Sequence, residues 1–286
     1  MASQAVVTPI QAAQLEEVGQ FLHDHLNRRF TARAWSDALR HPWCEAPPNF
    51  GFQLRDGGRL VGVLCAIYSD QAVGGRTEKF CNPHSWCVLD QYRNQGIGLV
   101  LAAVKQRGYH FTMLTPNPKV AEIFRHLKFK DLDAATLVFP NVPSARRLFG
   151  GGLIETHRDR IGMHLSGSDQ RDFELHRQIS WLHFVVVGQG TDRCLVAYKP
   201  TRWKRMPCAR LVHVSNAEAF ERLRGLVQHG LLSRGLLLSH VEQRFVMGKP
   251  PLALTGKRGQ AKLFLSPTLR DSEIRDLYSE LAALDV

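Results

Sequence analysis

A short segment in the first half of the chain combines one arginine with two closely spaced glycines. Its sequence is Arg93-Asn94-Gln95-Gly96-Ile97-Gly98. The preceding residues, Ser85–Leu89, predict a strand, and the following residues, Gly98–Gln106, predict a helix. A glycine turn at the start of a helix presents backbone N–H groups at the positive end of the helix dipole, where phosphate binds. The segment therefore predicts a phosphate-binding turn, with the charge of Arg93 beside it.

Two common nucleotide-binding patterns do not fit this turn. The dinucleotide pattern needs a third glycine three residues after Gly98, where the sequence has Leu101. The P-loop pattern needs a Gly-Lys-Ser/Thr ending, which is absent here. By itself, the turn therefore predicts phosphate binding without naming the ligand.

Helices and strands alternate around this turn. Apolar spacing predicts a helix from Pro9 to about Asn27, and Asp56-Gly57-Gly58 predicts a hairpin turn. The other expected elements are a helix at 32–39, strands at 50–55, 59–69 and 109–114, a helix at 118–127 and a strand at 134–139. This order predicts a mixed α/β domain over residues 1–140.

The second half repeats the order of the first. We expect strands at 179–187, 193–198, 210–214, 235–240 and 261–265, a helix at 217–229 and a closing helix at 268–284. Residues 141–286 are therefore predicted to form a second α/β domain. A diverged duplication of the first domain is our preferred interpretation, and an unrelated α/β appendage is the alternative.

A second motif lies downstream of the glycine turn, in the stretch Asn117–Phe129, which contains the predicted helix at 118–127. The stretch Val88–Gly98 and this helix together resemble the two signatures of the GNAT superfamily of N-acetyltransferases. Those signatures are Arg/Gln-x-x-Gly-x-Gly/Ala and a helix of the form Asn-x-x-Ala…Tyr…Leu-Gly-Phe. The resemblance covers residues 1–140 and implies a splayed mixed sheet. With the preferred interpretation of the second half, the fold is a tandem of this domain and a diverged GNAT-like second domain.

The resemblance also implies how acyl-CoA binds. The cofactor would lie between the strand ending at Leu89 and the strand Tyr109–Leu114, with pantetheine along the backbone of Cys87 and Val88. The groups implied to hold the pyrophosphate are Arg93 and the amides of Asn94, Gln95, Gly96, Ile97, Gly98 and Leu99. Asn117 and the helix that carries Phe124 would line the rest of the cofactor.

The sequence departs from the family pattern at two positions of the second motif. Phe124 stands where many relatives have a tyrosine that protonates the leaving thiolate, and Lys128 replaces a glycine. The second half departs further, because its corresponding turn, Ser215-Asn216-Ala217-Glu218, has no glycine pair and carries an acidic residue. We therefore expect the second domain to have lost cofactor binding and to close the acceptor site or form a homodimer.

Three side chains in the predicted strand before the turn, or in the residues just ahead of it, are candidates for catalysis. His84 is the candidate general base, since its ordinary pKa lies near neutrality, and packing or strand capping is its alternative role. Glu78 is the second candidate base. Cys87 could act as a nucleophile, but a cysteine inside a strand is more often a small core residue.

Composition limits the other classes of protein. The net charge of +11 is shared almost evenly between the two halves, whereas a nucleic-acid binder usually concentrates its charge. The spacing of Cys81, His84 and Cys87 fits no standard zinc site, so we expect no metal.

The chain shows no secretory pattern and no apolar stretch near the ~20 residues that span a bilayer. We expect reduced thiols and a cytoplasmic enzyme without a membrane partner.

These observations together predict an acyltransferase. The resemblance implies transfer from acetyl-CoA, or another acyl-CoA, to a primary amine by direct attack in a ternary complex. The acceptor would be a small molecule, a sugar or a peptide. Two alternatives stay open: a non-catalytic acyl-CoA sensor or scaffold, which Phe124 supports, and a tRNA- or nucleic-acid-binding member of the fold, which the basic charge supports.

Overall fold

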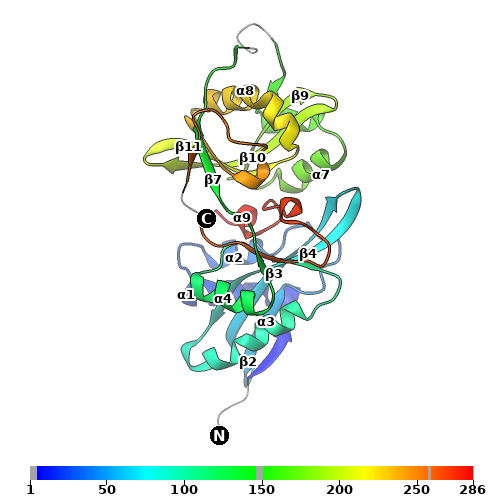
Figure 1. Ribbon diagram of the computed structural model, residues 1–286. Coiled ribbons are helices and arrows are strands. Elements are labelled where there is room, and N and C mark those ends of the chain that lie inside the picture. The colour runs from blue at the N-terminus through cyan, green and yellow to red at the C-terminus, as the bar shows by residue number, and fades with distance from the viewer. Residues whose placement is uncertain (1–4, 146–150, 257–258, 286) are drawn as a thin grey trace. The chain divides into compact units, whose positions relative to one another are not determined.

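The computed structural model describes residues 5–145, 151–256 and 259–285. The chain forms two compact units, and each contains a sheet of seven strands (Figure 1). The first unit comprises Met1–Asp131, Lys262–Ile274 and Tyr278–Val286. The second comprises Leu132–Ala261 and Arg275–Leu277. This division differs from the predicted boundary at residue 140. The strand Thr136–Pro140 belongs to the second unit, and residues 262–274 and 278–286 belong to the first.

The sheet of the first unit is mixed. Its strands, in spatial order, are β1 (Val6–Pro9), β2 (Gly51–Asp56), β3 (Arg59–Val73), β4 (Arg76–Val88), β5 (His110–Met113), β14 (Leu263–Leu265) and β6 (Lys130–Asp131). Its α-helices are α1 (Leu15–His25), α2 (Ala32–Asp37), α3 (Ile97–Val104), α4 (Pro118–His126) and α9 (Glu280–Ala283). Short 3-10 helices occupy Ala12–Gln14, Asp90–Gln95 and Asp271–Glu273.

Glycine turns set the register of the antiparallel part of this sheet. Gly57 and Gly58 have φ values of 53° and 87° and join β2 to β3, so the predicted hairpin is confirmed. Gly74 and Gly75, with φ values of 56° and 79°, join β3 to β4. The sequence prediction missed this second hairpin and began β4 near Ser85, because the outer part of the strand carries charged side chains.

The sheet of the second unit has its own set of elements. Its strands, in spatial order, are β8 (Ile154–Glu155), β9 (His183–Gln189), β10 (Asp192–Trp203), β11 (Met206–Val214), β12 (Leu238–Glu242), β7 (Thr136–Pro140) and β13 (Leu254–Thr255). Its helices are α6 (Arg158–Ile161), α7 (Gly167–His176) and α8 (Ala217–Ser233), with 3-10 helices at Gly162–His164 and Gln243–Phe245. Helix α8 packs on the sheet through Phe220, Leu223 and Val227 (Figure 1).

The two sheets correspond strand for strand. In both, the second to fourth strands are antiparallel neighbours and the fourth and fifth are parallel neighbours. In both, the strand beside the fifth is antiparallel to it and comes from the other half of the chain: β14 beside β5, and β7 beside β12. The prediction of a second domain with the fold of the first is therefore confirmed.

The structure corrects three predictions, two about strand partners and one about a helix. The strand expected at 134–139 exists as β7, but it pairs with β12 and β13 instead of completing the first domain. The strand expected at 261–265 exists as β14, but it pairs with β5 and β6. The closing helix expected over 268–284 is wrong, since this segment contains only Asp271–Glu273 and α9 as helical turns. Apolar patterns identified these strands but carried no information about their partners.

The expected start of the first helix is also wrong. Thr8 and Pro9 belong to β1, which pairs with β2, and α1 begins at Leu15. Strand pairing with β2 outweighs the local pattern of a capping threonine followed by proline.

Candidate functional site

The parallel strands β4 and β5 diverge after a short paired stretch. Their ladder joins Phe80 to His110 and Cys81 to Phe111, and no strand of the described chain pairs with this edge of β4 from residue 82 to 88. At the point of divergence, the amide of Asn82 donates hydrogen bonds to the carbonyl and hydroxyl oxygens of Thr112, at 3.0 and 3.1 Å. The splay leaves backbone groups of β4 available to an extended ligand. We call it the β4–β5 opening.

A β-bulge lies on β4 within this opening. Cys65 of β3 stands opposite His84 and Val63 opposite Cys87, so β4 has one extra residue between these pairs. Ser85 takes a φ of 52°, which is uncommon for a residue with a side chain. Because residues paired in an antiparallel ladder share a face, the bulge leaves His84 and Cys87 on one face.

His84 lies in the opening but is buried, with 2% of its surface exposed. Its Nδ1 atom lies 2.9 Å from the hydroxyl of Ser85, and its Nε2 atom has no hydrogen-bond partner in the described chain. Burial lowers the pKa of His84 to about 3, so the imidazole is neutral at pH 7 and a weak base. The predicted role of His84 as general base stays a prediction, and its burial weakens it.

Burial also decides against a nucleophilic role for Cys87. Its thiol belongs to the first unit's core face, and burial raises its pKa to about 11. The thiolate is the reactive form of cysteine, and a raised pKa leaves it scarce at neutral pH. The core interpretation of Cys87 therefore suits its surroundings better than the catalytic one.

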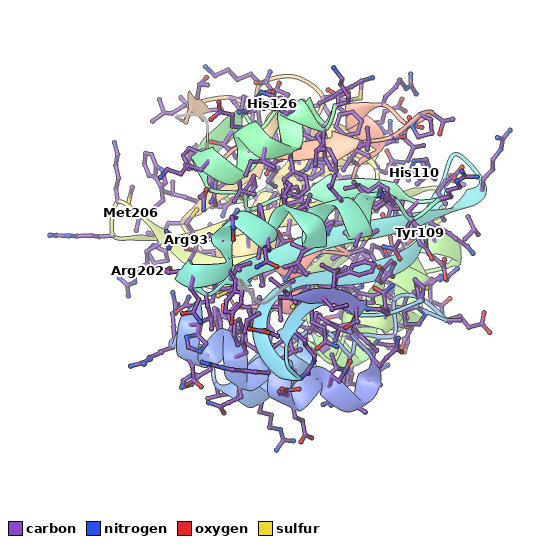
Figure 2. All side chains as sticks on the ribbon, turned by 90° about the horizontal axis from the view of Figure 1, so that it is seen from below. Arg93, Tyr109, His110, His126, Arg202 and Met206 are labelled. Carbon is purple, nitrogen blue, oxygen red and sulfur yellow. The ribbon has the colours of Figure 1, made fainter. Side chains whose placement is uncertain are left out.

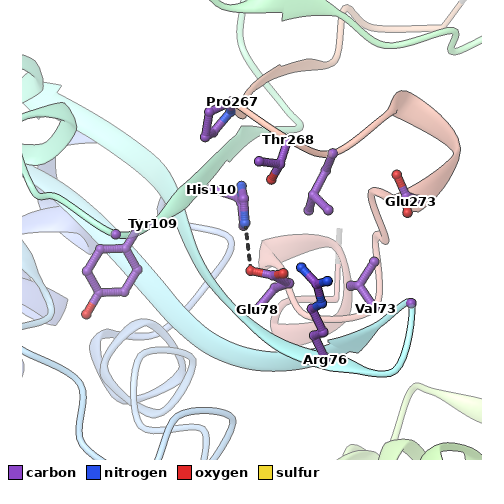
Figure 3. Close-up of a pocket in the computed structure, with 11 residues that line it drawn as sticks. Val73, Arg76, Glu78, Tyr109, His110, Pro267, Thr268 and Glu273 are labelled. Carbon is purple, nitrogen blue, oxygen red and sulfur yellow. Dashed lines mark hydrogen bonds and ion pairs between the residues drawn. The ribbon is translucent and has the colours of Figure 1, made fainter.

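Glu78 lies on the other side of the paired stretch from the opening. Its Oε2 atom is 3.1 Å from Nε2 of His110, at a cavity of about 550 Å³ (Figure 3). The cavity is also lined by Arg76, Tyr109 and Glu273. His110 Nδ1 lies 2.9 Å from the hydroxyl of Ser266. Glu78 and His84, which the sequence offered as alternatives for one role, are therefore in different sites.

Glu280 is a residue at the opening that the sequence reasoning missed. Its Oε1 atom accepts a hydrogen bond of 2.7 Å from the hydroxyl of Thr115, just beyond β5. Its backbone N–H donates to Oδ1 of Asn82 at 3.2 Å. Burial raises the pKa of Glu280 to about 7. No local motif marks this residue, because it is 198 positions from Asn82 and reaches β4 only through the returning C-terminal segment.

The predicted phosphate turn joins β4 to α3. The 3-10 helix Asp90–Gln95 precedes Gly96, which has a φ of −61°, so the glycine is not needed for a positive φ. A Cβ atom at Gly96 would lie 3.1 Å from Cγ2 of Val88 and 3.3 Å from the carbonyl oxygen of Arg93. A Cβ atom at Gly98 would lie 3.3 Å from Val7. The glycines therefore allow α3 to begin close against β4 and β1.

Some of the groups predicted to bind phosphate already have partners within the chain, and others do not. Arg93 lies in the 3-10 helix before α3, with its side chain largely exposed (Figure 2), and forms a 2.7 Å ion pair with Asp90. The amide of Gly96 donates to the carbonyl of Arg93 at 3.2 Å, and that of Leu99 to the carbonyl of Gly96 at 3.1 Å. The first N–H groups of a helix have no acceptor within it. Because the amide of Leu99 is already bonded, these groups in α3 belong to Ile97 and Gly98.

The second motif contains residues with structural roles in α4. Oδ1 of Asn117 accepts a hydrogen bond of 3.0 Å from the amide of Val120 and caps the helix. Phe124 is completely buried and packs edge-on against Phe129, with 4.9 Å between ring centroids. Lys128 ends the helix with a φ of 70°. Lys128 adopts the left-handed conformation that the family's glycine would adopt without strain.

In the second unit the two corresponding parallel strands also diverge, but different side chains lie there. Strands β11 and β12 pair from 208–210 to 238–240 and then separate, and a bulge on β11 lies between Leu211 and His213. His213 is buried 3.8 Å from the carboxylate of Asp172, which also forms a 3.0 Å ion pair with Arg275. Burial lowers the pKa of His213 to about 3. Buried ionic groups thus line the bulged strand of this unit.

The start of α8 also differs from the start of α3. Oδ1 of Asn216 accepts a hydrogen bond of 2.9 Å from the amide of Ala219, and Glu218 adds a negative charge in the first turn. Ser215 donates to Asp169 at 3.1 Å. The helix end is already capped and faces carboxylates, so it is poorly suited to pyrophosphate.

Within residues 5–145, 151–256 and 259–285, no group of three or more His, Cys, Asp or Glu side chains is placed to hold a metal ion. Over the same residues, no helix combines the length and the apolar character that crossing a bilayer requires.

Comparison with known proteins agrees with this geometry. Residues 19–129 match the model of the acetyltransferase (GNAT) family. No curated protein matches the sequence. Among solved structures, the chain is similar to a GCN5-related N-acetyltransferase from Anabaena variabilis, with a TM-score of 0.61, 9% identity, and coverage of 91% of this chain and 72% of the other.

Two other structures show the same likeness. A GCN5-related N-acetyltransferase from Kribbella flavida gives a TM-score of 0.54 and 14% identity, covering 92% of this chain and 71% of the other. Eis1 from Mycobacterium abscessus gives 0.53 and 14%, covering 91% and 73%. At these identities the likeness establishes the fold alone. It extends over both units, in keeping with their matching sheets.

Proposed function

We propose that this protein, whose residues 19–129 form a GNAT acetyltransferase domain, transfers an acyl group from acyl-CoA to a primary amine. Acetyl-CoA is the proposed donor, and a small molecule, a sugar or a peptide is the proposed acceptor. The observation that carries the proposal is the β4–β5 opening, which places an unpaired strand edge beside the glycine turn and α3. A cofactor with an extended thiol-bearing arm and a pyrophosphate needs an unpaired strand edge for the arm and, next to it, amides that can bind the pyrophosphate.

The residues of the first unit fit the proposed cofactor along its length. The backbone of Cys87 and Val88, on the free edge of β4, would bind pantetheine. The amides at the start of α3, with Arg93, would bind pyrophosphate, and Arg93 would exchange its ion pair with Asp90 for the phosphate. The capped helix α4, from Asn117, would line the remainder.

Acyl-CoA would supply a thioester that an amine can attack directly. The chain's own part is to align the thioester along β4 and to accept the proton that the amine loses. Phe124 provides no acid for the leaving thiolate and is buried away from solvent. The thiolate is a fair leaving group without help, so the missing tyrosine is compatible with catalysis.

The test is release of free thiol from acetyl-CoA in the presence of a panel of primary amines, with CoA binding measured in parallel. Amine-dependent thiol release supports the proposal. The variant Arg93→Ala should weaken CoA binding. The matched control Arg222→Ala removes an exposed arginine of the second unit, ion-paired with Asp192 at 2.8 Å, and should leave binding unchanged.

The same assay separates the proposal from its alternatives. Binding of CoA without turnover of any amine would favour a sensor or scaffold, the alternative that Phe124 supports. Binding to tRNA that weakens steeply with salt, without CoA binding, would favour a nucleic-acid-binding member of the fold. The proposed donor is an intracellular metabolite, so the proposal includes a cytoplasmic location.

A further inference from the structure

Four polar residues from three segments of the chain meet where β4 and β5 diverge. Asn82 of β4 bridges to Thr112 of β5 and accepts a hydrogen bond from the backbone of Glu280. Thr115 donates to the carboxylate of Glu280. The C-terminal segment thus fixes one buried carboxyl group at the divergence of β4 and β5, where the proposed acyl-CoA site begins.

The two oxygens of this carboxyl group have different surroundings. Oε1 of Glu280 accepts the hydrogen bond from Thr115, whereas Oε2 is buried and has no hydrogen-bond partner in the described chain. Leaving a buried acceptor unpaired costs free energy, so such atoms in a native structure call for an explanation. A donor that arrives with a ligand would satisfy Oε2.

We propose that Glu280 accepts the proton of the acceptor amine at Oε2. This inference rests on the proposed acyl transfer. The ammonium group of the acceptor gives one proton to the Glu280 carboxylate, and the nitrogen lone pair then attacks the thioester carbon. The C–N bond forms, the C–S bond breaks with its electron pair on sulfur, and the second nitrogen proton passes to the CoA thiolate. Glu280 then releases its proton to water.

The surroundings of Glu280 give it the right basicity for this step. Burial raises its pKa to about 7, and the hydrogen bond from Thr115 and the positive charge of Lys262 oppose this rise in part. His84, on the neighbouring part of β4, stays neutral at this pH because its pKa is about 3. A carboxylate with a pKa near the working pH removes a proton most effectively.

The other candidates lack one of these properties. His84 lies in the opening but is a weak base. Glu78 lies beyond the paired rungs of β4 and β5 and contacts His110. Glu280 combines position at the opening, an unpaired oxygen and a matching pKa.

The test compares kcat/KM for amine acetylation as a function of pH in wild-type protein and in Glu280→Gln. For the wild type we expect kcat/KM to fall below about pH 7 as Glu280 becomes protonated. Glu280→Gln should lower kcat/KM by roughly 10²–10⁴-fold and abolish this acidic limb, with CoA affinity unchanged. The matched control Glu273→Gln changes another glutamate of the C-terminal segment and should keep both rate and limb.

A second variant tests the assignment through the pKa. Thr115→Val removes the hydroxyl that stabilises the ionised carboxylate, so the acidic limb should move to higher pH. A merely structural role of Glu280 would not move this limb. Glu280→Gln with wild-type rate and an unchanged limb would overturn the inference and leave the proposed acyl transfer standing.

If the wild-type protein acetylates no amine, the proposed function fails, and the inference, which rests on it, fails with it. The raised pKa of Glu280 is tested separately, through stability. Wild-type protein should lose stability relative to Glu280→Gln as pH rises from 4.5 to 7, because the folded state holds the proton more tightly than the unfolded state. Identical pH dependence of the two melting temperatures would overturn the inference as well.

Discussion

The two units have the same strand order, the same exchanged strand and a bulge on the corresponding strand, yet they differ at the place where two parallel strands separate. In the first unit, β4 leads through a glycine turn to α3, and its edge is unpaired. In the second, β11 leads to a helix capped by Asn216 and is accompanied by buried ionic groups. The shared fold supplies the opening. The residues at the helix start and along the bulged strand decide whether the opening can take a ligand.

The largest expected effect tests the structural role of ions in the second unit. Arg244 is buried between Glu242, at 2.7 Å, and Asp276, at 2.5 Å. Replacing it with methionine removes the buried positive charge that lies between two carboxylates. We expect Arg244→Met to lower the free energy of unfolding by about 3–5 kcal/mol, measured by denaturant titration. A loss below 1 kcal/mol would show that these ions do not hold the second unit together.

The next effect concerns the buried carboxyl of the first unit. Burial destabilises the ionised form of Glu280 and raises its pKa from the ordinary value of 4.5 to about 7. Above pH 7, Glu280→Gln should therefore raise the free energy of unfolding by about 3 kcal/mol, and the gain should vanish below pH 4.5. A gain that is independent of pH would mean that Glu280 titrates normally.

A substitution at the helix start after the bulged strand should weaken CoA binding in the first unit and leave it unaffected in the second. Gly96→Val places side-chain atoms against Val88 and the carbonyl of Arg93, so the start of α3 must move. We expect CoA affinity to fall by about 10–100-fold, equivalent to about 1.4–2.8 kcal/mol, in a calorimetric titration. The matched change at the start of α8, Ala217→Val, should leave CoA affinity unaltered, and an equal loss in both variants would contradict the comparison.

The smallest effect concerns the end of α4. Lys128 has a φ of 70° and closes the helix, with its amide bonded to Arg125 and that of Phe129 bonded to Phe124. Glycine adopts this conformation without steric cost, so Lys128→Gly should stabilise the protein by about 1 kcal/mol in thermal unfolding. A destabilised variant would show that the lysine side chain makes contacts that outweigh its backbone strain.

The sequence predicted local features better than long-range ones. The turn at Gly57 and Gly58, the start of the helix after Asn117 and the glycine pair before α3 are encoded by neighbouring residues, so their patterns were readable. Strand partners are not encoded in this way. A buried apolar strand such as β7 fits either sheet equally well on pattern, and its pairing with β12 depends on the whole topology.

The same limit explains the outcome at the site. The segment that would bind phosphate lies within one motif, and its position between β4 and α3 followed from the sequence. The carboxyl group at the opening did not, because Glu280 reaches Asn82 and Thr115 only after the chain has formed the second unit and returned. Histidine was the natural candidate from residue type, but the burial of His84 could not be seen in the sequence.

The number of CoA molecules bound per chain tests the central claim most directly. Calorimetric titration of the purified protein should give one CoA per chain for wild-type protein and for Ala217→Val, and much weaker binding for Gly96→Val. This result would locate the cofactor at the turn before α3. Two molecules per chain, or one molecule whose affinity is unchanged by Gly96→Val, would contradict the assignment of the β4–β5 opening as the single acyl-CoA site.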